Sequence, residues 1–159
     1  MLNVLIVEDD LTIADLLQEA LEDDGFHVTG VARTTQEAVE SIERKCPDAA
    51  VVDIRLANGD LGTDVGAYLR AKTGTRIMFS TGNSNDSDQI SDCGDAVMTK
   101  PYRLSDVGRG LRIIDEILEF GETKIKFPRN FRLLASADSY TPPPREPETA
   151  SCESVPPRL

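Results

Sequence analysis

Near its start the chain carries an apolar run that ends in three acids: residues 2–10 read Leu-Asn-Val-Leu-Ile-Val-Glu-Asp-Asp. Four more short apolar runs follow, at 26–31, 49–54, 77–80 and 96–98. Their length and their content of β-branched residues are typical of strands that are buried on both faces of a parallel sheet. The sequence therefore predicts five buried strands, of which the first ends in a cluster of carboxylates.

Longer segments with helical spacing separate these runs. Apolar residues recur three and four positions apart within 13–21, 38–42, 65–69 and 107–118. The segment 83–92 is rich in Ser, Asn and Asp, which compete with a helical backbone for hydrogen bonds, so we expect only a short or irregular helix there. Strands that alternate with helices through right-handed crossovers predict an α/β fold with an open five-stranded parallel sheet and helices on both faces.

The composition excludes several classes of protein. The chain has 159 residues, with 17 Lys and Arg against 28 Asp and Glu. No stretch approaches the roughly 20 apolar residues of a membrane span, and the acidic excess argues against nonspecific nucleic-acid binding. The three cysteines fit neither a disulfide framework nor a zinc site, and the first residues do not resemble a secretory signal. We expect a cytoplasmic protein without membrane or nucleic-acid partners.

Charge and proline divide the chain into two parts. Residues 1–120 carry a net charge of -12, whereas 121–159 carry +1 and hold seven of the nine prolines. We expect a folded domain at 1–120 and a C-terminal extension at 121–159 that is basic, then Pro-rich, and largely disordered. Within it, 123–134 interleaves four bases with apolar residues. That segment could dock a partner, fold back onto the acidic domain, or be an idle connector.

The candidate site lies at the carboxyl ends of the strands, where open α/β sheets bind their ligands. Polar side chains follow four of the predicted strands: Glu8, Asp9 and Asp10 the first, Asp53 the third, Thr81 the fourth, and Lys100 the fifth. Asp10 is expected to cap the following helix, because acids favour helix N-termini. Each residue alone is weak evidence for a site. Their joint occurrence at one edge of one sheet is the strong signal.

These residue types suit one kind of chemistry. Crowded carboxylates repel one another, and Mg2+ relieves that repulsion because it prefers carboxylate, water and phosphate oxygens. One carboxylate can then attack a phosphorus donor and form an aspartyl phosphate. Asp53 is the natural nucleophile, since it stands alone while Glu8 and Asp9 form a pair. Lys100 would offset charge on the phosphoryl oxygens, and the Thr81 hydroxyl could hydrogen-bond the new phosphate.

With this set of site residues, residues 1–120 resemble the response-regulator receiver domain of bacterial two-component signalling. Four motifs carry the resemblance: Val-Leu-Ile-Val-Glu-Asp-Asp at 4–10, Val-Val-Asp-Ile-Arg-Leu at 51–56, Ser-Thr-Gly at 80–82 and Lys-Pro-Tyr at 100–102. The resemblance implies a flavodoxin-like fold with strand order 2-1-3-4-5 and a cis bond before Pro101. It implies that Asp53 is the phosphoacceptor and that Thr81 and Lys100 contact the phosphate. It also implies that Mg2+ is held by Glu8, Asp9, Asp53 and the backbone carbonyl of Arg55.

Two departures from the family are visible. The family usually has Tyr or Phe three residues before the lysine, as a rotameric switch, and Val97 stands there. The interval from Thr81 to Lys100 is also a few residues short, which agrees with the weak segment 83–92. The end of the fourth strand, Phe-Ser-Thr-Gly-Asn at 79–83, resembles that of a subset of stand-alone receivers.

The resemblance implies a stand-alone phosphoprotein without turnover activity. It would accept a phosphoryl group on Asp53 from a sensor histidine kinase or a histidine phosphotransfer protein and signal through a downstream protein partner. The alternative is a binding module with a receiver fold that works without phosphorylation, which Val97 keeps open. A phosphohydrolase of the haloacid-dehalogenase type is discounted, because Arg55 stands where that class needs a second acid.

Overall fold

The computed structural model describes residues 1–86, 90 and 92–134 of the chain. The expected tail at 135–159 lies outside the described residues, and so do residues 87–89 and 91 of the segment 83–92. Two short 3-10 turns, Ala57–Gly59 and Ser84–Asp86, stand beside the longer elements. The strands are β1 (Asn3–Val7), β2 (His27–Ala32), β3 (Ala49–Asp53), β4 (Arg76–Thr81), β5 (Ala96–Thr99) and β6 (Phe131–Leu133). The helices are α1 (Leu11–Asp23), α2 (Thr35–Arg44), α3 (Gly62–Lys72) and α5 (Leu104–Phe120).

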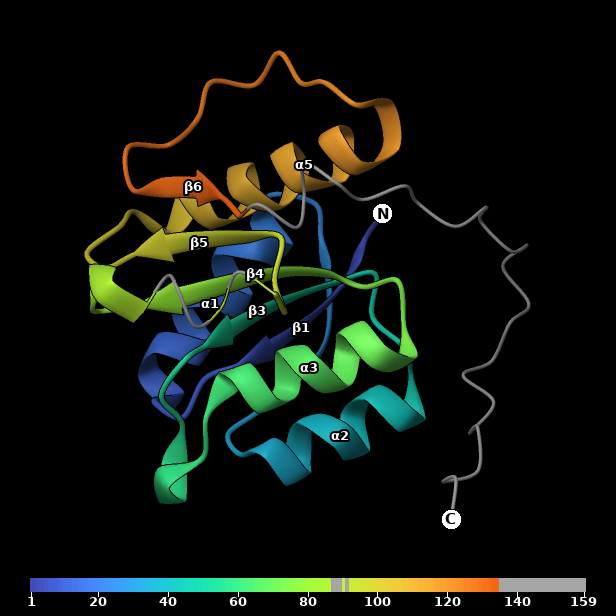
Figure 1. The fold of residues 1–159 in the computed structure, drawn as a ribbon, viewed down its shortest axis with the longest axis vertical. Coiled ribbons are helices and arrows are strands. Elements are labelled where there is room, and N and C mark those ends of the chain that lie inside the picture. The colour runs from blue at the N-terminus through green and yellow to red at the C-terminus, as the bar shows by residue number, and fades with distance from the viewer. Residues whose placement is uncertain (87–89, 91, 135–159) are drawn as a thin grey trace.

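The sheet confirms the expected order and adds one strand to it. Its strands run β2-β1-β3-β4-β5-β6, and the first five are parallel (Figure 1). The last strand, β6, pairs antiparallel with β5, so that Phe131 lies opposite Met98. The prediction of five strands lacked β6 because three residues are too few for their alternation of apolar and polar side chains to indicate a strand. The segment 123–134 therefore folds back onto the domain.

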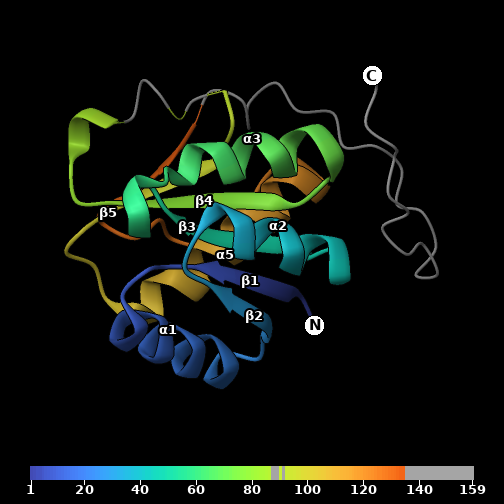
Figure 2. The same cartoon turned by 90° about the horizontal axis from the view of Figure 1, so that it is seen from below.

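Helices cover both faces of the sheet, as expected for an α/β fold. One core lies between the sheet and the pair α1 and α5, and a second lies under α2 and α3. Figure 2 shows α2 and α3 on the side of the sheet opposite α1. Every residue of β3 is buried, as a strand between two helical layers requires. Asp53, the last residue of that strand, therefore emerges from the middle of the sheet.

Local sequence signals set the helix ends. The Asp10 side chain accepts hydrogen bonds from the backbone N–H groups of Thr12 and Ile13, which confirms it as the N-cap of α1. At the other end of the fold, Gly121 adopts a left-handed conformation with φ 78° and ends α5. In the part of 83–92 that the structure describes, the 3-10 turn Ser84–Asp86 stands where a fourth helix was expected to be short or irregular.

Candidate functional site

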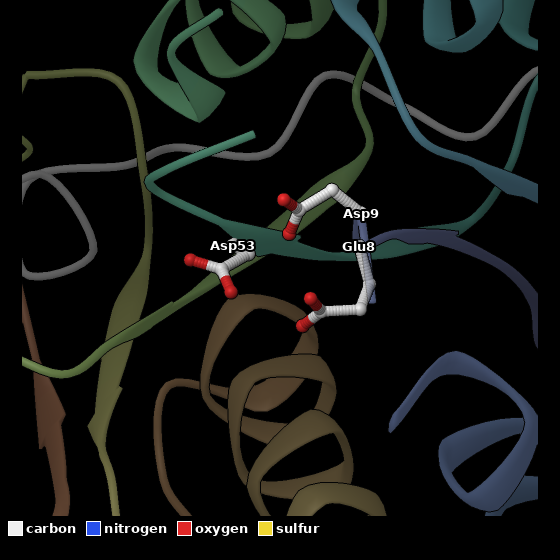
Figure 3. A group of neighbouring side chains, drawn as sticks. All are labelled: Glu8, Asp9 and Asp53. Atoms are coloured by element: carbon white, nitrogen blue, oxygen red, sulfur yellow. The ribbon is translucent and has the colours of Figure 1, made fainter. Parts of the chain in front are cut away.

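The ends of β1 and β3 bring three acids together. One carboxylate oxygen from each of Glu8, Asp9 and Asp53 lies within 4.8 Å of the others. Figure 3 shows the three side chains converging from the two strand ends. Since β1 and β3 are parallel neighbours with Val7 opposite Val52, the residues that follow them meet at one edge of the sheet. The predicted cluster of carboxylates is thus present.

Glu8 is the most deeply buried acid of this cluster, with 3% of its surface exposed. Burial raises its pKa from 4.5 to about 7, and the nearby negative charge of Asp53 adds to the increase. A hydrogen bond from the backbone N–H of Asp10 to Oε1, at 3.1 Å, acts in the opposite direction. The cluster therefore holds its negative charge at a free-energy cost that a cation would relieve.

Lys100 supplies the positive charge of the site. Its Nζ donates to Oδ2 of Asp53 at 2.8 Å and lies 3.8 Å from Oε2 of Glu8. Burial lowers the pKa of Lys100, but the hydrogen bond and the charges of the two acids outweigh it, so the pKa is raised overall. The lysine is therefore charged when it contacts Asp53. The bond before Pro101 is cis, as the resemblance implied.

Backbone groups fix the position of Asp53. The N–H of Arg55 donates to Oδ1 of Asp53 at 3.1 Å, while the Arg55 side chain is exposed. The N-terminus of α3 approaches from the other side, where the N–H of Gly62 donates to the carbonyl of Ile54 at 2.7 Å. A Cβ atom at Gly62 would lie 2.0 Å from the Asp53 carbonyl oxygen. Only glycine permits this approach.

Thr81 reaches the same edge of the sheet, but its hydroxyl is engaged elsewhere. Thr81 is buried at the end of β4, and its Oγ1 lies 2.8 Å from Oδ2 of Asp86 and 3.1 Å from the carbonyl of Asn83. The backbone N–H of Asn83 in turn donates to Oγ1 at 3.0 Å. Sequence reasoning missed Asp86, since nothing in a segment rich in Asp and Asn singles out one carboxylate.

A second contact beside the site was also missed. The hydroxyl groups of Ser80 and Tyr102 lie 3.0 Å apart, which joins the end of β4 to the residue after Pro101. Burial raises the pKa of Tyr102, so this phenol stays protonated. The sequence signal for this contact is the Lys-Pro-Tyr motif, in which Tyr102 directly follows Pro101. Val97, where an aromatic residue would be usual, is buried in β5 with 3% exposed.

The fold and the site define a class of protein, and comparison with known families identifies it. Residues 4–107 match the family model of the response regulator receiver domain. The chain therefore belongs to this family, and it contains a receiver domain of a two-component response regulator. Receiver domains are normally signalling modules without turnover.

Among curated proteins, the chain is similar to the sensory transduction protein RegX3 of Mycobacterium tuberculosis. The two are 28% identical over 161 residues, which cover 92% of this chain and 70% of RegX3. The chain is also 33% identical over 108 residues to the transcriptional regulatory protein PdtaR of the same organism, covering 66% of this chain and 52% of PdtaR. It thus spans about half the length of PdtaR and more of RegX3.

Among solved structures, the chain is similar to the response regulator TrrA of Thermotoga maritima in complex with Mg2+ and BeF. The TM-score is 0.64 at 25% identity, and the match covers 70% of this chain and 97% of TrrA. Separately, none of the helices in the described part of the chain is both long enough and apolar enough to cross a membrane.

Proposed function

We propose that this chain is a phosphoacceptor that takes a phosphoryl group onto Asp53 from a phosphohistidine donor. The observation that carries the proposal is the contact of Lys100 Nζ with Asp53 at 2.8 Å, inside a cluster that also holds Glu8 and Asp9. An Asp53 oxygen attacks the phosphorus, the P–N bond breaks, and its electron pair stays on the imidazole nitrogen of the donor. The product is an aspartyl phosphate.

The donor set of the site fits Mg2+. Three carboxylates within 4.8 Å of one another supply the hard oxygen ligands that this ion prefers. Glu8, Asp9 and Asp53 would hold the ion together with the backbone carbonyl of Arg55. When bound, Mg2+ neutralises part of the charge on the transferred phosphoryl oxygens. Support for this assignment comes from TrrA, whose structure contains Mg2+ and BeF.

Lys100 and Thr81 act on the phosphoryl group itself. Lys100 already contacts Asp53, so its ammonium group can follow the developing charge on a phosphoryl oxygen. The Thr81 hydroxyl now contacts Asp86, so a hydrogen bond to the phosphate requires it to leave that carboxylate. The same exchange would free the 3-10 turn Ser84–Asp86 to move. Phosphorylation would thus be read out through Thr81.

The partners follow from the chemistry. The donor is a sensor histidine kinase or a histidine phosphotransfer protein, and the output is a contact with a downstream protein. We assign the receiver to residues 1–120 and treat 121–159 as an extension that follows it. The acidic net charge of -11 fits a protein partner better than a nucleic acid. We propose that the phosphoryl group modifies Asp53 of the chain itself as a signal and leaves by transfer or hydrolysis, and that the chain is not a turnover enzyme.

One observation favours a second function, a binding module that does not need phosphorylation. Position 97 in β5 is occupied by a buried valine, so this position has no aromatic side chain that could switch between rotamers. In that case a partner would bind the protein equally well with or without a group on Asp53.

The test is phosphorylation by a small phosphodonor, followed by intact mass spectrometry. We expect the protein to gain one phosphoryl group in the presence of Mg2+ and the Asp53→Asn variant to gain none. Asp60→Asn is a matched control, because Asp60 lies in the same loop but binds the backbone N–H of Thr35 at 2.8 Å. Labelling that persists in Asp53→Asn would overturn the proposal.

A further inference from the structure

An open groove of about 1100 Å³ lies between the start of α5 and the returning chain that leads to β6. Its floor includes Pro101 and Tyr102, and its outer wall is the segment 126–130. Phe127 stands in that wall with 43% of its surface exposed, and its ring packs edge-on against Phe131 with centroids 5.3 Å apart. The groove therefore offers an aromatic surface on a fixed support.

The groove is basic, although the molecule is acidic. Asp106 is the one acid among its lining residues. Four exposed cations line it: Arg103, Arg109, Lys126 and Arg129. Arg109 lies 3.5 Å from Asp106, whereas the other three form no ion pair within the described part of the chain. Unpaired cations gathered in one groove attract a negatively charged ligand.

Tyr102 connects this groove to the proposed phosphorylation site. Tyr102 lines the groove, and its hydroxyl lies 3.0 Å from Oγ of Ser80, the neighbour of Thr81. The backbone of Tyr102 is two residues from Lys100, which contacts Asp53. A movement of Lys100 or of the end of β4 therefore reaches the groove through one side chain.

The returning chain is tied to the same segment. The side-chain amide of Asn130 donates to the carbonyl of Pro101, and the N–H of Thr99 donates to the carbonyl of Asn130 at 2.9 Å. One residue thus holds the outer wall to both sides of Lys100. The wall and the floor of the groove are both fixed to the segment that carries the lysine.

We propose that this basic groove is the output surface of the chain, that it takes an acidic segment of a partner protein, and that Tyr102 transmits the state of the Asp53 site to it. The inference rests on the proposed function. Charge complementarity selects carboxylates, and the exposed ring of Phe127 selects an apolar or aromatic side chain among them. A nucleic acid is disfavoured as the ligand, because the groove has few cations and the chain as a whole has a net charge of -11.

The test measures binding of a fluorescein-labelled peptide in which glutamates flank one phenylalanine, by fluorescence anisotropy with the full chain. We expect Lys126→Glu or Arg129→Glu to weaken binding by at least about tenfold. The control is Lys45→Glu, which changes the net charge equally but lies after α2, beside the other core. We expect it to weaken binding by less than about threefold.

Coupling is tested with Mg2+ and beryllofluoride as a phosphoryl mimic, whose binding is followed by the amide signals of Asp53 and Lys100. We expect the mimic to change peptide affinity at least about threefold in the unmodified protein and in Tyr68→Phe. In Tyr102→Phe the change should be lost while the mimic still binds. Tyr68 is the matched control, because its hydroxyl contacts Glu43 on α2, away from the site.

Several results would overturn the inference. The first is that the peptide does not bind. The second is that Lys126→Glu and Lys45→Glu weaken peptide binding equally. The third is that the affinity for the peptide stays the same although the mimic binds. Tighter binding of a single-stranded DNA of equal charge would assign the groove to nucleic acid instead. Self-association that Arg129→Glu abolishes would assign it to a second copy. If the mimic itself fails to bind at Asp53, the proposed function fails, which is a separate outcome.

Discussion

At the scale of single residues, the position of Asp53 depends on Gly62, the first residue of α3. A Cβ at Gly62 would lie 2.0 Å from the Asp53 carbonyl and 2.8 Å from Cγ1 of Val52. We predict that Gly62→Ala lowers the free energy of unfolding by about 1–3 kcal/mol, because a backbone carbonyl cannot rotate away from the clash. Urea unfolding followed by circular dichroism measures the change.

The matched control is Gly82→Ala, beside the same site. A Cβ at Gly82 meets no heavy atom within 4 Å, so we expect a change within about 0.5 kcal/mol. Equal effects at the two glycines would contradict the argument that close approach, and not backbone freedom, requires Gly62.

Glu8 gives a second prediction, on pH. Its pKa is raised by burial from 4.5 to about 7, so the ionised form is disfavoured in the folded protein. The contribution of Glu8 to the stability of the metal-free protein should therefore fall as pH rises from 4.5 to 7 and change no further above that. Glu8→Gln should raise the free energy of unfolding by about 1–3 kcal/mol above pH 7 in EDTA.

At pH 4.5, where Glu8 is protonated in the folded state, that gain should shrink toward zero. The measurement is urea unfolding of the two proteins at both pH values. Glu19→Gln, on the exposed side of α1, is the control and should show no such pH dependence. A gain from Glu8→Gln that is equal at both pH values would show that the charge of Glu8 is not its cause.

The residues of the candidate site could be named from the sequence because each stands at or just after the carboxyl end of an apolar strand. Glu8, Asp9, Asp53 and Lys100 meet in the structure for that reason. The partner of Thr81 could not be predicted, because the Thr81 hydroxyl turns to Asp86 in a segment without a hydrophobic pattern. Hydroxyl orientation depends on the final loop geometry, which strand-end position alone does not define.

At the scale of elements, β6 is the part of the fold that sequence patterns missed. Phe131 is buried with 7% of its surface exposed, and a Cβ at Gly110 of α5 would lie 3.1 Å from its ring. We predict that Phe131→Ala lowers the free energy of unfolding by about 3–5 kcal/mol, because it leaves a cavity between β6 and α5. Thermal and urea unfolding measure the loss.

Phe127→Ala is the control for this prediction. Phe127 is 43% exposed in the wall of the groove, so we expect a loss of less than about 1 kcal/mol. If Phe131→Ala cost no more than Phe127→Ala, β6 would not contribute to the stability of the domain.

The five parallel strands were predictable because each contains a short apolar run, and because four of them, all but β4, lie next to a helix that has its own apolar period. The sixth is short, antiparallel, and carries Arg132 between Phe131 and Leu133. Its position depends on hydrogen bonds with β5 and on the Asn130 contact to Pro101, which are long-range interactions. Tertiary contacts of this kind leave no local signal in the sequence.

At the scale of the whole molecule, the acidic charge is unevenly distributed. Residues 1–120 carry -12, and a small part of that charge forms the cluster of Glu8, Asp9 and Asp53. The basic groove interrupts the acidic surface where the segment 126–130 returns to the sheet. A negatively charged partner would therefore be attracted locally and repelled elsewhere, which favours one orientation of binding.

The central claim, that Asp53 accepts the phosphoryl group, is tested most directly by locating the modification. The protein is treated with a small phosphodonor and Mg2+ and then reduced with borohydride, which converts an aspartyl phosphate to homoserine. Peptide mass spectrometry then identifies the modified position. We predict homoserine at position 53 alone, and none when Mg2+ is omitted. Homoserine at another aspartate, or its absence from position 53 after treatment with donor and Mg2+, would contradict the account.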